Sequence, residues 1–321
     1  MLTVLIPTAA RPSLLRMALQ SVAVQTAAAR IDRIVVSENG ADPNSRLVCQ
    51  EFPQLPINYV FREPALKPLE HAQVLMKESL QGDITCILHD DDWWLPNHLE
   101  DALASLEAEP EAAAYGANFI FYQEPDLRQR YDLSAWFGAN YPAEAPFWRM
   151  SHSNVLLASF FGLIVHYSSL VARTAALAQS AFVYDLDNPF DNDRMILLAL
   201  SRCGPVLFNP EIRIVVRHHE ARETSLFDLA ERSRRMTQTS EWMVGLGLKS
   251  WAVIAGAFAK RLTACPDEKK KRDLIRIATI RPWCLPEMAR HLDRVTDKEF
   301  FSMYDQARKA FGGEPRADDP R

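Results

Sequence analysis

Three consecutive carboxylates, Asp90, Asp91 and Asp92, directly follow the apolar run 83–88. The run predicts a buried strand that ends at the aspartates, and open α/β sheets bind their ligands at such strand ends. Clustered carboxylates repel one another unless a cation lies among them, and hard oxygen ligands favour Mg²⁺ or Mn²⁺ over zinc. Two tryptophans come next, which is unusual for a solvated acidic turn. We therefore expect a divalent metal held by Asp91, with help from Asp90 or Asp92.

Two further groups of polar residues lie between positions 184 and 220. Residues 184–193 contain four aspartates and lead into an apolar helix at 195–200. Acidic residues at a helix start are commonly caps or partners of the helix dipole. A predicted strand at 206–216 then ends in Arg217, followed by a histidine pair. A guanidinium or imidazole at that strand end could contact a diphosphate or a metal.

The surrounding pattern alternates strands and helices as far as residue 123. This alternation predicts an α/β fold with a mainly parallel sheet and helices on both faces. Strands are expected at 2–6, 31–37, 57–61, 83–88 and 112–122, and helices at 13–25, 69–80 and 97–107. Pro7, Thr8 and Arg11 follow the first strand and Glu38 ends the second, so these residues are expected at the same sheet edge as the aspartates.

On these motifs the chain resembles the family 2 glycosyltransferases. The shared features are a first strand ending in Pro7-Thr8 with Arg11-Pro12 shortly after, the turn at Glu38, and an Asp-rich motif ending in a hydrophobic residue and Pro96. The resemblance is strong over residues 1–110 and weaker to 220. It implies a GT-A fold with a Rossmann-like nucleotide-binding half, and an inverting transfer of a sugar from a nucleoside-diphosphate sugar to an acceptor.

The resemblance also implies a general base. Inverting members carry an acidic pair, often Glu-Asp, before a helix, with the aspartate as base. Asn192-Asp193 corresponds to that pair, so the base maps to Asp193, while Asn192 departs from the pattern and leaves Asp191 as a competitor. A second departure is His89, which stands where the family's metal motif begins with an aspartate.

The other implied roles concern the donor. Pro7, Thr8 and Arg11 would line the nucleotide site. Glu38 would accept the imino proton of uracil or thymine, which favours UDP or dTDP, although guanine also offers donors. Arg217 would contact the diphosphate, and His219, which fits the family's Arg-x-His motif, would help to hold the Mn²⁺ or Mg²⁺ cofactor.

Composition agrees with such an enzyme. The chain has 321 residues, 48% of them hydrophobic, and a net charge of −5, which argues against general nucleic-acid binding. Its five cysteines include no CxxC pair, so neither a disulfide framework nor a zinc site is expected. This cysteine content fits the reducing cytoplasm, which is the expected location. We expect a donor-binding half at 1–123, an acceptor-binding and catalytic half at 124–225, a helical C-terminal region at 226–311 and a flexible tail at 312–321.

Three alternatives stay open. A nucleotidyltransferase making sugar nucleotides would use similar acidic ligands, although no glycine-rich basic loop follows the first strand. A non-catalytic sugar-nucleotide-binding protein would account for His89 and Asn192. A peripheral enzyme at the inner face of the membrane, acting on a lipid-linked acceptor, is suggested by the basic run 269–272. The apolar stretch 155–172 is interrupted by polar residues, so a buried strand at 163–171 beside the acceptor pocket is expected there, not a membrane span.

Overall fold

The computed structural model describes residues 1–40, 44–123, 126–128, 146–152, 155, 165–180 and 192–217. These residues all belong to one compact unit, formed by Met1–Val155 and Leu163–Asp228. The helical region expected at 226–311, the tail, the basic run 269–272 and most of the loop 123–150 lie outside the described residues.

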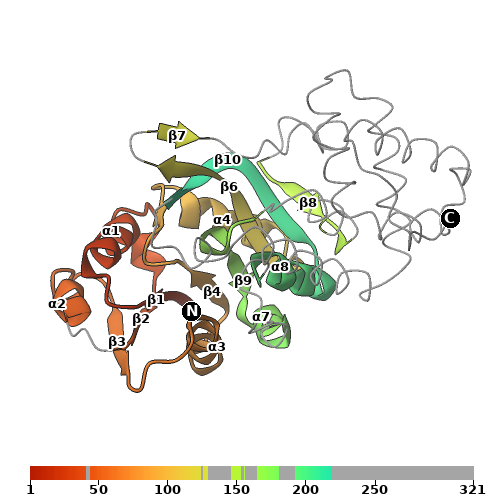
Figure 1. Ribbon diagram of the computed structural model, residues 1–321. Helices are drawn as coiled ribbons and strands as arrows, with labels where there is room; N and C mark the ends of the chain where they lie inside the picture. The colour runs from red at the N-terminus through yellow and green to blue at the C-terminus, as the bar shows by residue number, and fades with distance from the viewer. Residues whose placement is uncertain are drawn as a thin grey trace, which may run out of the picture. The chain divides into compact units, whose positions relative to one another are not determined.

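Ten of the described strands form one mixed sheet (Figure 1). Its order is β3-β2-β1-β4-β9-β6-β10-β5, with β7 beside β6 and β8 beside β10. The strands are β1 (Leu2–Thr8), β2 (Arg33–Asn39), β3 (Ile57–Arg62), β4 (Ile84–Ile87), β5 (Trp93–Trp94), β6 (Ala114–Gln123), β7 (Asp126–Arg128), β8 (Trp148–Met150), β9 (Val171–Arg173) and β10 (Val206–Arg217).

The first four strands are parallel, as the alternating pattern predicts. β1 pairs with both β2 and β4, and β2 pairs with β3. In this register Thr8 lies opposite Glu38, and the backbone N–H of Leu88 donates to the carbonyl of Leu5 at 3.0 Å. The carboxyl ends of β1, β2 and β4 therefore meet at one edge of the sheet, where the polar residues after each strand come together.

Helices cover both faces of this parallel half, because alternate strand residues point to opposite faces. Val4, Ile6 and Val36 belong to a buried cluster that includes the apolar sides of α1, α2 and α4. The other face contacts α3 and α7, and α7 packs on α8. The helices are α1 (Pro12–Ala23), α2 (Asn44–Gln50), α3 (Pro68–Ser79), α4 (His98–Ala108), α7 (Thr174–Ser180) and α8 (Asn192–Cys203), with short 3₁₀ helices η1 (Ala28–Arg30) and η2 (Tyr167–Ser169).

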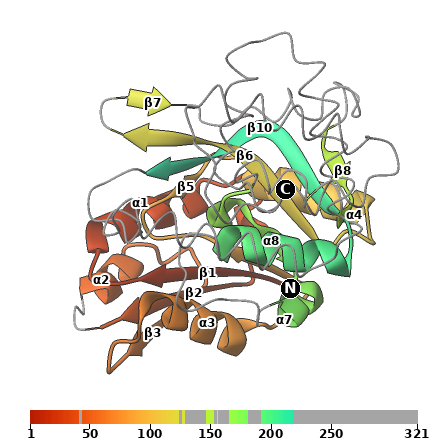
Figure 2. The same cartoon turned by 45° about the vertical axis from the view of Figure 1, so that its right-hand side comes forward.

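The second half of the sheet is mixed. β9 runs antiparallel to both β4 and β6, and β10 lies parallel to β6 along its whole length. β10 is long and strongly bent (Figure 2), and its pairing with β6 shifts register between Asn209 and Ile214. Through this bend the carboxyl end of β10 reaches β5, the short strand that follows the three aspartates.

The prediction of a strand at 163–171 is wrong for residues 165–170. These residues form a buried turn around η2, and the strand β9 begins only at Val171. The reason is local: the Ser168 N–H donates to His166 Nδ1, and the Ser169 hydroxyl donates to the His166 carbonyl. Such side-chain bonds compete with the hydrogen bonds of a strand ladder. Within the described residues, no helix has the length and apolar character needed to cross a membrane.

Candidate active site

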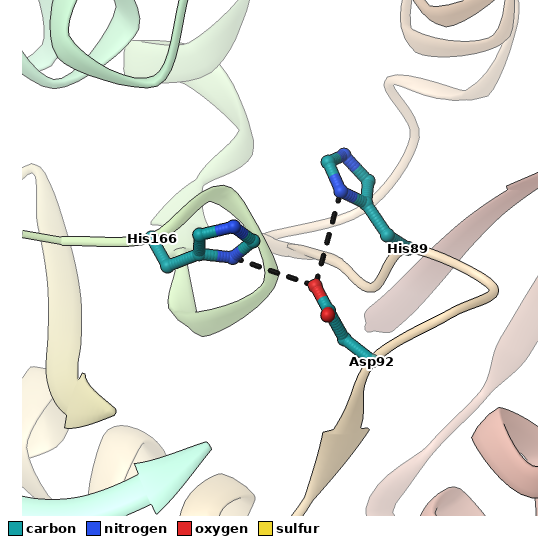
Figure 3. A group of neighbouring side chains, drawn as sticks. All are labelled: His89, Asp92 and His166. Atoms are coloured by element: carbon teal, nitrogen blue, oxygen red, sulfur yellow. Dashed lines mark ion pairs between the residues drawn. The ribbon is translucent and has the colours of Figure 1, made fainter. Parts of the chain in front are cut away.

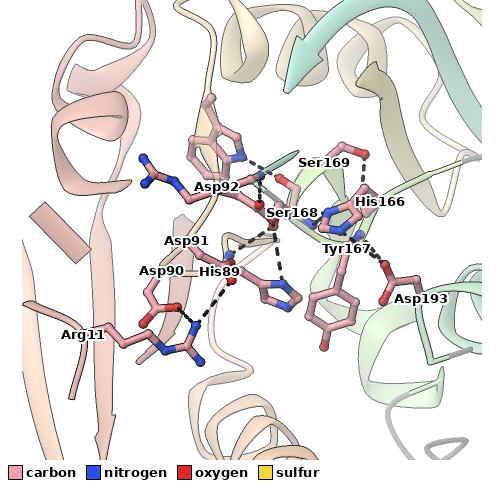
Figure 4. A network of polar contacts seen from close by, with 12 residues as sticks. Arg11, His89, Asp90, Asp91, Asp92, His166, Tyr167, Ser168, Ser169 and Asp193 are labelled. Atoms are coloured by element: carbon pink, nitrogen blue, oxygen red, sulfur yellow. Dashed lines mark hydrogen bonds and ion pairs between the residues drawn. The ribbon is translucent and has the colours of Figure 1, made fainter. Parts of the chain in front are cut away.

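The turn after β4 directs its three carboxylates to different sides. The Asp92 N–H donates to the His89 carbonyl at 3.2 Å and closes the turn, and the next two residues form β5 against β10. Figure 4 shows Asp90 and Asp91 on the side of Arg11, and Asp92 on the side of His166. The three aspartates therefore do not converge on one point.

Asp90 and Asp91 share a positive partner. The Arg11 Nη1 atom lies 3.5 Å from Asp90 Oδ1 and 3.4 Å from Asp91 Oδ2 (Figure 4). The Thr8 hydroxyl donates to the other Asp90 oxygen at 2.7 Å, within the buried edge of the sheet. Two carboxylates from the turn after β4 thus converge with Thr8, the last residue of β1, and with Arg11, which follows that strand, at the sheet edge expected from the sequence.

Burial raises the pKa of Asp90 to about 7, because the carboxyl is almost fully removed from water and Asp91 lies beside it, while Arg11 acts in the opposite direction. A carboxyl in this state gains from a nearby cation, which favours its charged form. The pair therefore has the chemistry of a site for a divalent ion.

Asp92 lies at the centre of a separate cluster with two imidazoles (Figure 3). Its Oδ2 is 3.5 Å from His166 Nδ1 and 3.9 Å from His89 Nδ1, and it accepts a 2.5 Å hydrogen bond from the Ser168 hydroxyl. Its Oδ1 accepts from the backbone N–H of Arg217 at 3.1 Å. Only 1% of the Asp92 side chain is exposed, so this carboxylate is a buried anchor between β4, η2 and β10.

Asp193 is joined to the same cluster from α8. Its Oδ2 accepts from the backbone N–H of Tyr167 at 3.1 Å and lies 3.9 Å from His166 Nε2. The Asp193 side chain is 22% exposed, and both contacts fall on one of its two oxygens. Among the described residues both of these contacts are made by Oδ2, and a partly exposed carboxylate can accept a proton from a substrate hydroxyl that reaches it.

Glu38 is a buried carboxylate at the end of β2. Its Oε1 accepts a 2.7 Å hydrogen bond from the N–H of Ala10, whose φ of 54° lies in the left-handed region. Among the described residues, none provides a hydrogen-bond partner for Glu38 Oε2, although the residue has no exposed surface. A buried acceptor of this kind needs a donor that the described residues do not supply, such as a water molecule or a ligand group.

Arg217 ends β10 beside Asp92. Its guanidinium lies 5.5 Å from the centre of the Trp93 ring and 6.0 Å from that of Tyr122. Its Nη2 also contacts the sulfur of Met17 at 2.9 Å. These partners come from β5, β6 and α1, and they hold a fixed positive charge at the edge that carries the aspartates.

The structure thus brings together Pro7, Thr8, Arg11, Glu38, Asp90, Asp91, Asp92, Asp193 and Arg217 at one edge of the described unit. Asp191 and His219, the other predicted base and metal ligand, lie outside the described residues. The sequence reading missed His166 and Ser168. The signal for them is the polar run that interrupts the apolar stretch 155–172.

A cavity of about 540 Å³ opens at the opposite edge, lined by Met1, Asp32, Asp83 and Arg173 among others. It lies at the amino ends of β1 and β4. The cavity is therefore not part of the candidate active site.

Comparison with known proteins identifies the family. The model of glycosyl transferase family 2 matches residues 3–168. Among curated proteins no match was found. The crystal structure of S. aureus TarS 1–349 in complex with UDP-GlcNAc is similar, with 12% identity over 97% of this chain and 91% of that one and a TM-score of 0.62.

The mannosyltransferase PcManGT from Pyrobaculum calidifontis, in complex with GDP-Man and Mn²⁺, has 16% identity over 97% of this chain and 80% of that one, with a TM-score of 0.51. At such identities the likeness concerns the fold alone, and the fold is that of GT-A glycosyltransferases. The family match covers more than half of the chain. The chain therefore belongs to glycosyl transferase family 2 and is a glycosyltransferase.

Proposed function

We propose that this glycosyltransferase moves a sugar from a nucleoside-diphosphate sugar to an acceptor, with inversion at the anomeric carbon and with the help of a divalent cation. The observation that carries the proposal is the meeting of a carboxylate pair, Asp90 and Asp91, with a separate, partly exposed carboxylate, Asp193, at one sheet edge. The TarS and PcManGT structures, which share the fold, contain UDP-GlcNAc and GDP-Man.

The donor nucleotide would lie over the ends of β1 and β2. The unpartnered Oε2 of the buried Glu38 supports recognition of an imino N–H, which uracil and thymine both present. Guanine also presents donors, so the favoured donors are UDP and dTDP sugars, with GDP sugars as the alternative. Pro7, Thr8 and Arg11 would line this site.

The residues suited to the cation are Asp91 and Asp90. Their oxygens already converge on one guanidinium, and two carboxylates form a hard oxygen donor set that suits Mn²⁺ or Mg²⁺. A bound divalent ion would neutralise the negative charge that develops on the departing diphosphate. Arg217 would add a fixed positive charge to the same leaving group, and Arg11 would move to a phosphate as the ion takes its place between the carboxylates.

Asp193 would act as the general base. The acceptor oxygen forms a bond to the anomeric carbon as the bond from that carbon to the diphosphate oxygen breaks, and the acceptor proton passes to Asp193 Oδ1. Tyr167 N–H and His166 hold the other oxygen, so the carboxylate is kept in one orientation. General-base catalysis of this kind typically contributes ~10²- to 10⁴-fold.

The test is a panel of UDP, dTDP and GDP sugars with Mn²⁺, in which binding is followed by thermal shift and release of free nucleoside diphosphate by coupled assay. One donor class should stabilise the protein and be consumed. Asp193→Asn should lower turnover by ~10²-fold or more while donor binding and melting temperature hardly change, because only the transition state uses the basicity. Asp191→Asn should have a much smaller effect.

Several outcomes would contradict the proposal. Binding of sugar nucleotides without any release of nucleotide would favour the non-catalytic binding protein. Pyrophosphate release from a nucleoside triphosphate and a sugar phosphate would favour the nucleotidyltransferase. A larger loss in Asp191→Asn than in Asp193→Asn would move the base to Asp191, and unfolding of Asp193→Asn would mark Asp193 as a helix cap.

A further inference from the structure

We infer that His89, Asp92 and His166 form a second cation site, separate from the Asp90–Asp91 pair, that takes a transition-metal ion such as Zn²⁺ or Co²⁺ in preference to Mg²⁺. The inference goes beyond the transfer reaction, because its three ligand atoms have no role in the proposed donor and acceptor chemistry, although His166 also contacts the proposed base Asp193 through Nε2. It starts from the cluster in Figure 3, where both rings turn a nitrogen toward the same carboxylate oxygen.

The distances fit a single ion after a small movement. Ligands about 2.0–2.1 Å from a zinc ion in tetrahedral arrangement lie about 3.3–3.4 Å apart. Asp92 Oδ2 and His166 Nδ1 are already 3.5 Å apart, and the three ligand atoms all lie within 4.8 Å of one another. His89 must move the most, and its side chain is 36% exposed, so it has room to do so.

The hydrogen bonds prepare His166 as a ligand. The Ser168 N–H donates to His166 Nδ1 at 3.3 Å, so in this arrangement Nδ1 is unprotonated and the proton belongs on Nε2. This long hydrogen bond uses the same lone pair and would have to break when an ion binds Nδ1. The Nε2 side lies 3.9 Å from the Asp193 carboxylate. A carboxylate that accepts from the second nitrogen of a histidine ligand fixes its tautomer and raises its basicity, and Asp193 would supply this support if the ring moved a few tenths of an ångström toward it.

Other contacts hold the remaining two ligands in place. The His89 ring stacks on Tyr167 with ring centres 5.2 Å apart and planes 26° apart. The Asp92 carboxylate is held by the Ser168 hydroxyl and the Arg217 N–H. Ser168 is fixed in turn, since its carbonyl accepts a 2.6 Å hydrogen bond from Trp94 Nε1. The donor atoms therefore converge from supported positions.

The ligand chemistry separates this site from the Asp90–Asp91 pair. Two imidazole nitrogens and one carboxylate suit Zn²⁺, Co²⁺ or Ni²⁺, whereas Mg²⁺ prefers oxygen ligands. An ion here would connect the turn after β4 to η2 and, through His166, to Asp193. It would thus hold the proposed base at a set distance from the Asp motif.

The test uses the untagged full-length protein, freed of metal by a chelator, since a histidine tag would itself bind Co²⁺. Titration calorimetry and visible absorption with Co²⁺ should give one site with nitrogen-ligand d–d bands that Zn²⁺ displaces and excess Mg²⁺ does not. His166→Gln and His89→Ala should each weaken Co²⁺ binding by more than ~10-fold. Melting curves of the metal-free variants check that each one folds.

Two controls separate this site from other possibilities. His152→Gln removes a histidine that bonds to Ser201, away from the cluster, and should bind Co²⁺ as the wild type does. Asp91→Asn should keep the Co²⁺ bands while losing the Mn²⁺ dependence of nucleotide binding, so this inference and the proposed function fail separately. Wild-type Co²⁺ binding by a folded His89→Ala protein would overturn the inference, as would the absence of Co²⁺ bands in the wild type.

Discussion

At the scale of single residues, Asp91 is the carboxylate on which the metal dependence of donor binding rests. One of its oxygens lies 3.4 Å from Arg11, and its side chain is 12% exposed, so a ligand can reach it. Asp91→Asn removes a charged ligand with little change of volume. Nucleoside-diphosphate binding, measured by titration calorimetry with and without chelator, should become weak and nearly insensitive to Mn²⁺. Asp83→Asn, at the amino end of β4, is the matched control, and unchanged metal dependence in Asp91→Asn would exclude Asp91 as the ligand.

Glu38 is the residue expected to select the base. In Glu38→Gln the amide oxygen can still accept from Ala10 N–H, but its NH₂ group then faces the site where the imino N–H would bind. Two donors that face each other leave a buried polar group unsatisfied, at about 1–3 kcal/mol, or roughly 5- to 150-fold in affinity. In competition binding, the affinity for the preferred nucleotide should fall by this factor, and the affinity for the other nucleotides should fall much less. An equal loss for every nucleotide would show that Glu38 only supports the turn at Ala10.

At the scale of elements, the site depends on the close approach of β6 to the turn before β9. A Cβ atom at Gly116 would lie 2.6 Å from both γ-carbons of Val165. Gly116→Ala should therefore push residues 165–169 away from β6 and lower the free energy of unfolding by about 1–3 kcal/mol in urea titrations. Val165→Ala in the same chain removes the two γ-carbons and should recover part of the loss. Additive effects of the two substitutions would contradict this account.

A displacement of the turn at 165–169 would also move the side chains of the proposed active site. His166, Tyr167 and Ser168 form contacts with Asp92 on β4's turn and with Asp193 on α8. The turn therefore connects parts of the chain that are far apart in sequence. Asp92 and Ser168 are separated by 76 positions, and Asp193 and Tyr167 by 26. Activity in Gly116→Ala should accordingly fall more than donor binding does.

At the scale of the whole molecule, buried histidines make stability depend on pH. Burial, and to a smaller extent Arg213, lowers the pKa of His98 to about 3, between the rings of Trp94 and Tyr115. In the unfolded chain an imidazole has a pKa of about 6.5, so between these values the unfolded state binds more protons. The contribution of His98 to stability is therefore present above about pH 6.5 and is lost as the pH falls toward 3.

His98→Phe isolates this contribution, because the other titrating groups are shared by both proteins. Relative to the variant, the wild type should lose ~1.4 kcal/mol of unfolding free energy per pH unit between about pH 6 and pH 4. Urea denaturation at a series of pH values measures this difference. Parallel stability curves for the two proteins would contradict it.

The local pattern of the sequence determined the elements and the edge at which the chemistry lies. Apolar runs of strand length followed by helical periodicity predicted β1, β2, β3 and β4 together with α1, α3 and α4, because each pattern depends on neighbouring residues alone. The short helix α2 between β2 and β3 was not predicted. Parallel strands joined by helices place their carboxyl ends at one edge. For this reason Thr8, Glu38 and Asp91 could be assigned to one site from their positions at or after the ends of predicted strands, whereas Asp193 was assigned from the resemblance to the family.

Only the tertiary structure decided how those residues divide into groups. The sequence treats Asp90, Asp91 and Asp92 alike, but the turn after β4 directs the first two to Arg11 and the third to His166, which is 74 positions away along the chain. The stretch at 165–170 has the composition of a buried strand and becomes a turn. Contacts between distant residues depend on strand register and on the packing of β6, β9 and β10, and no local periodicity carries that information.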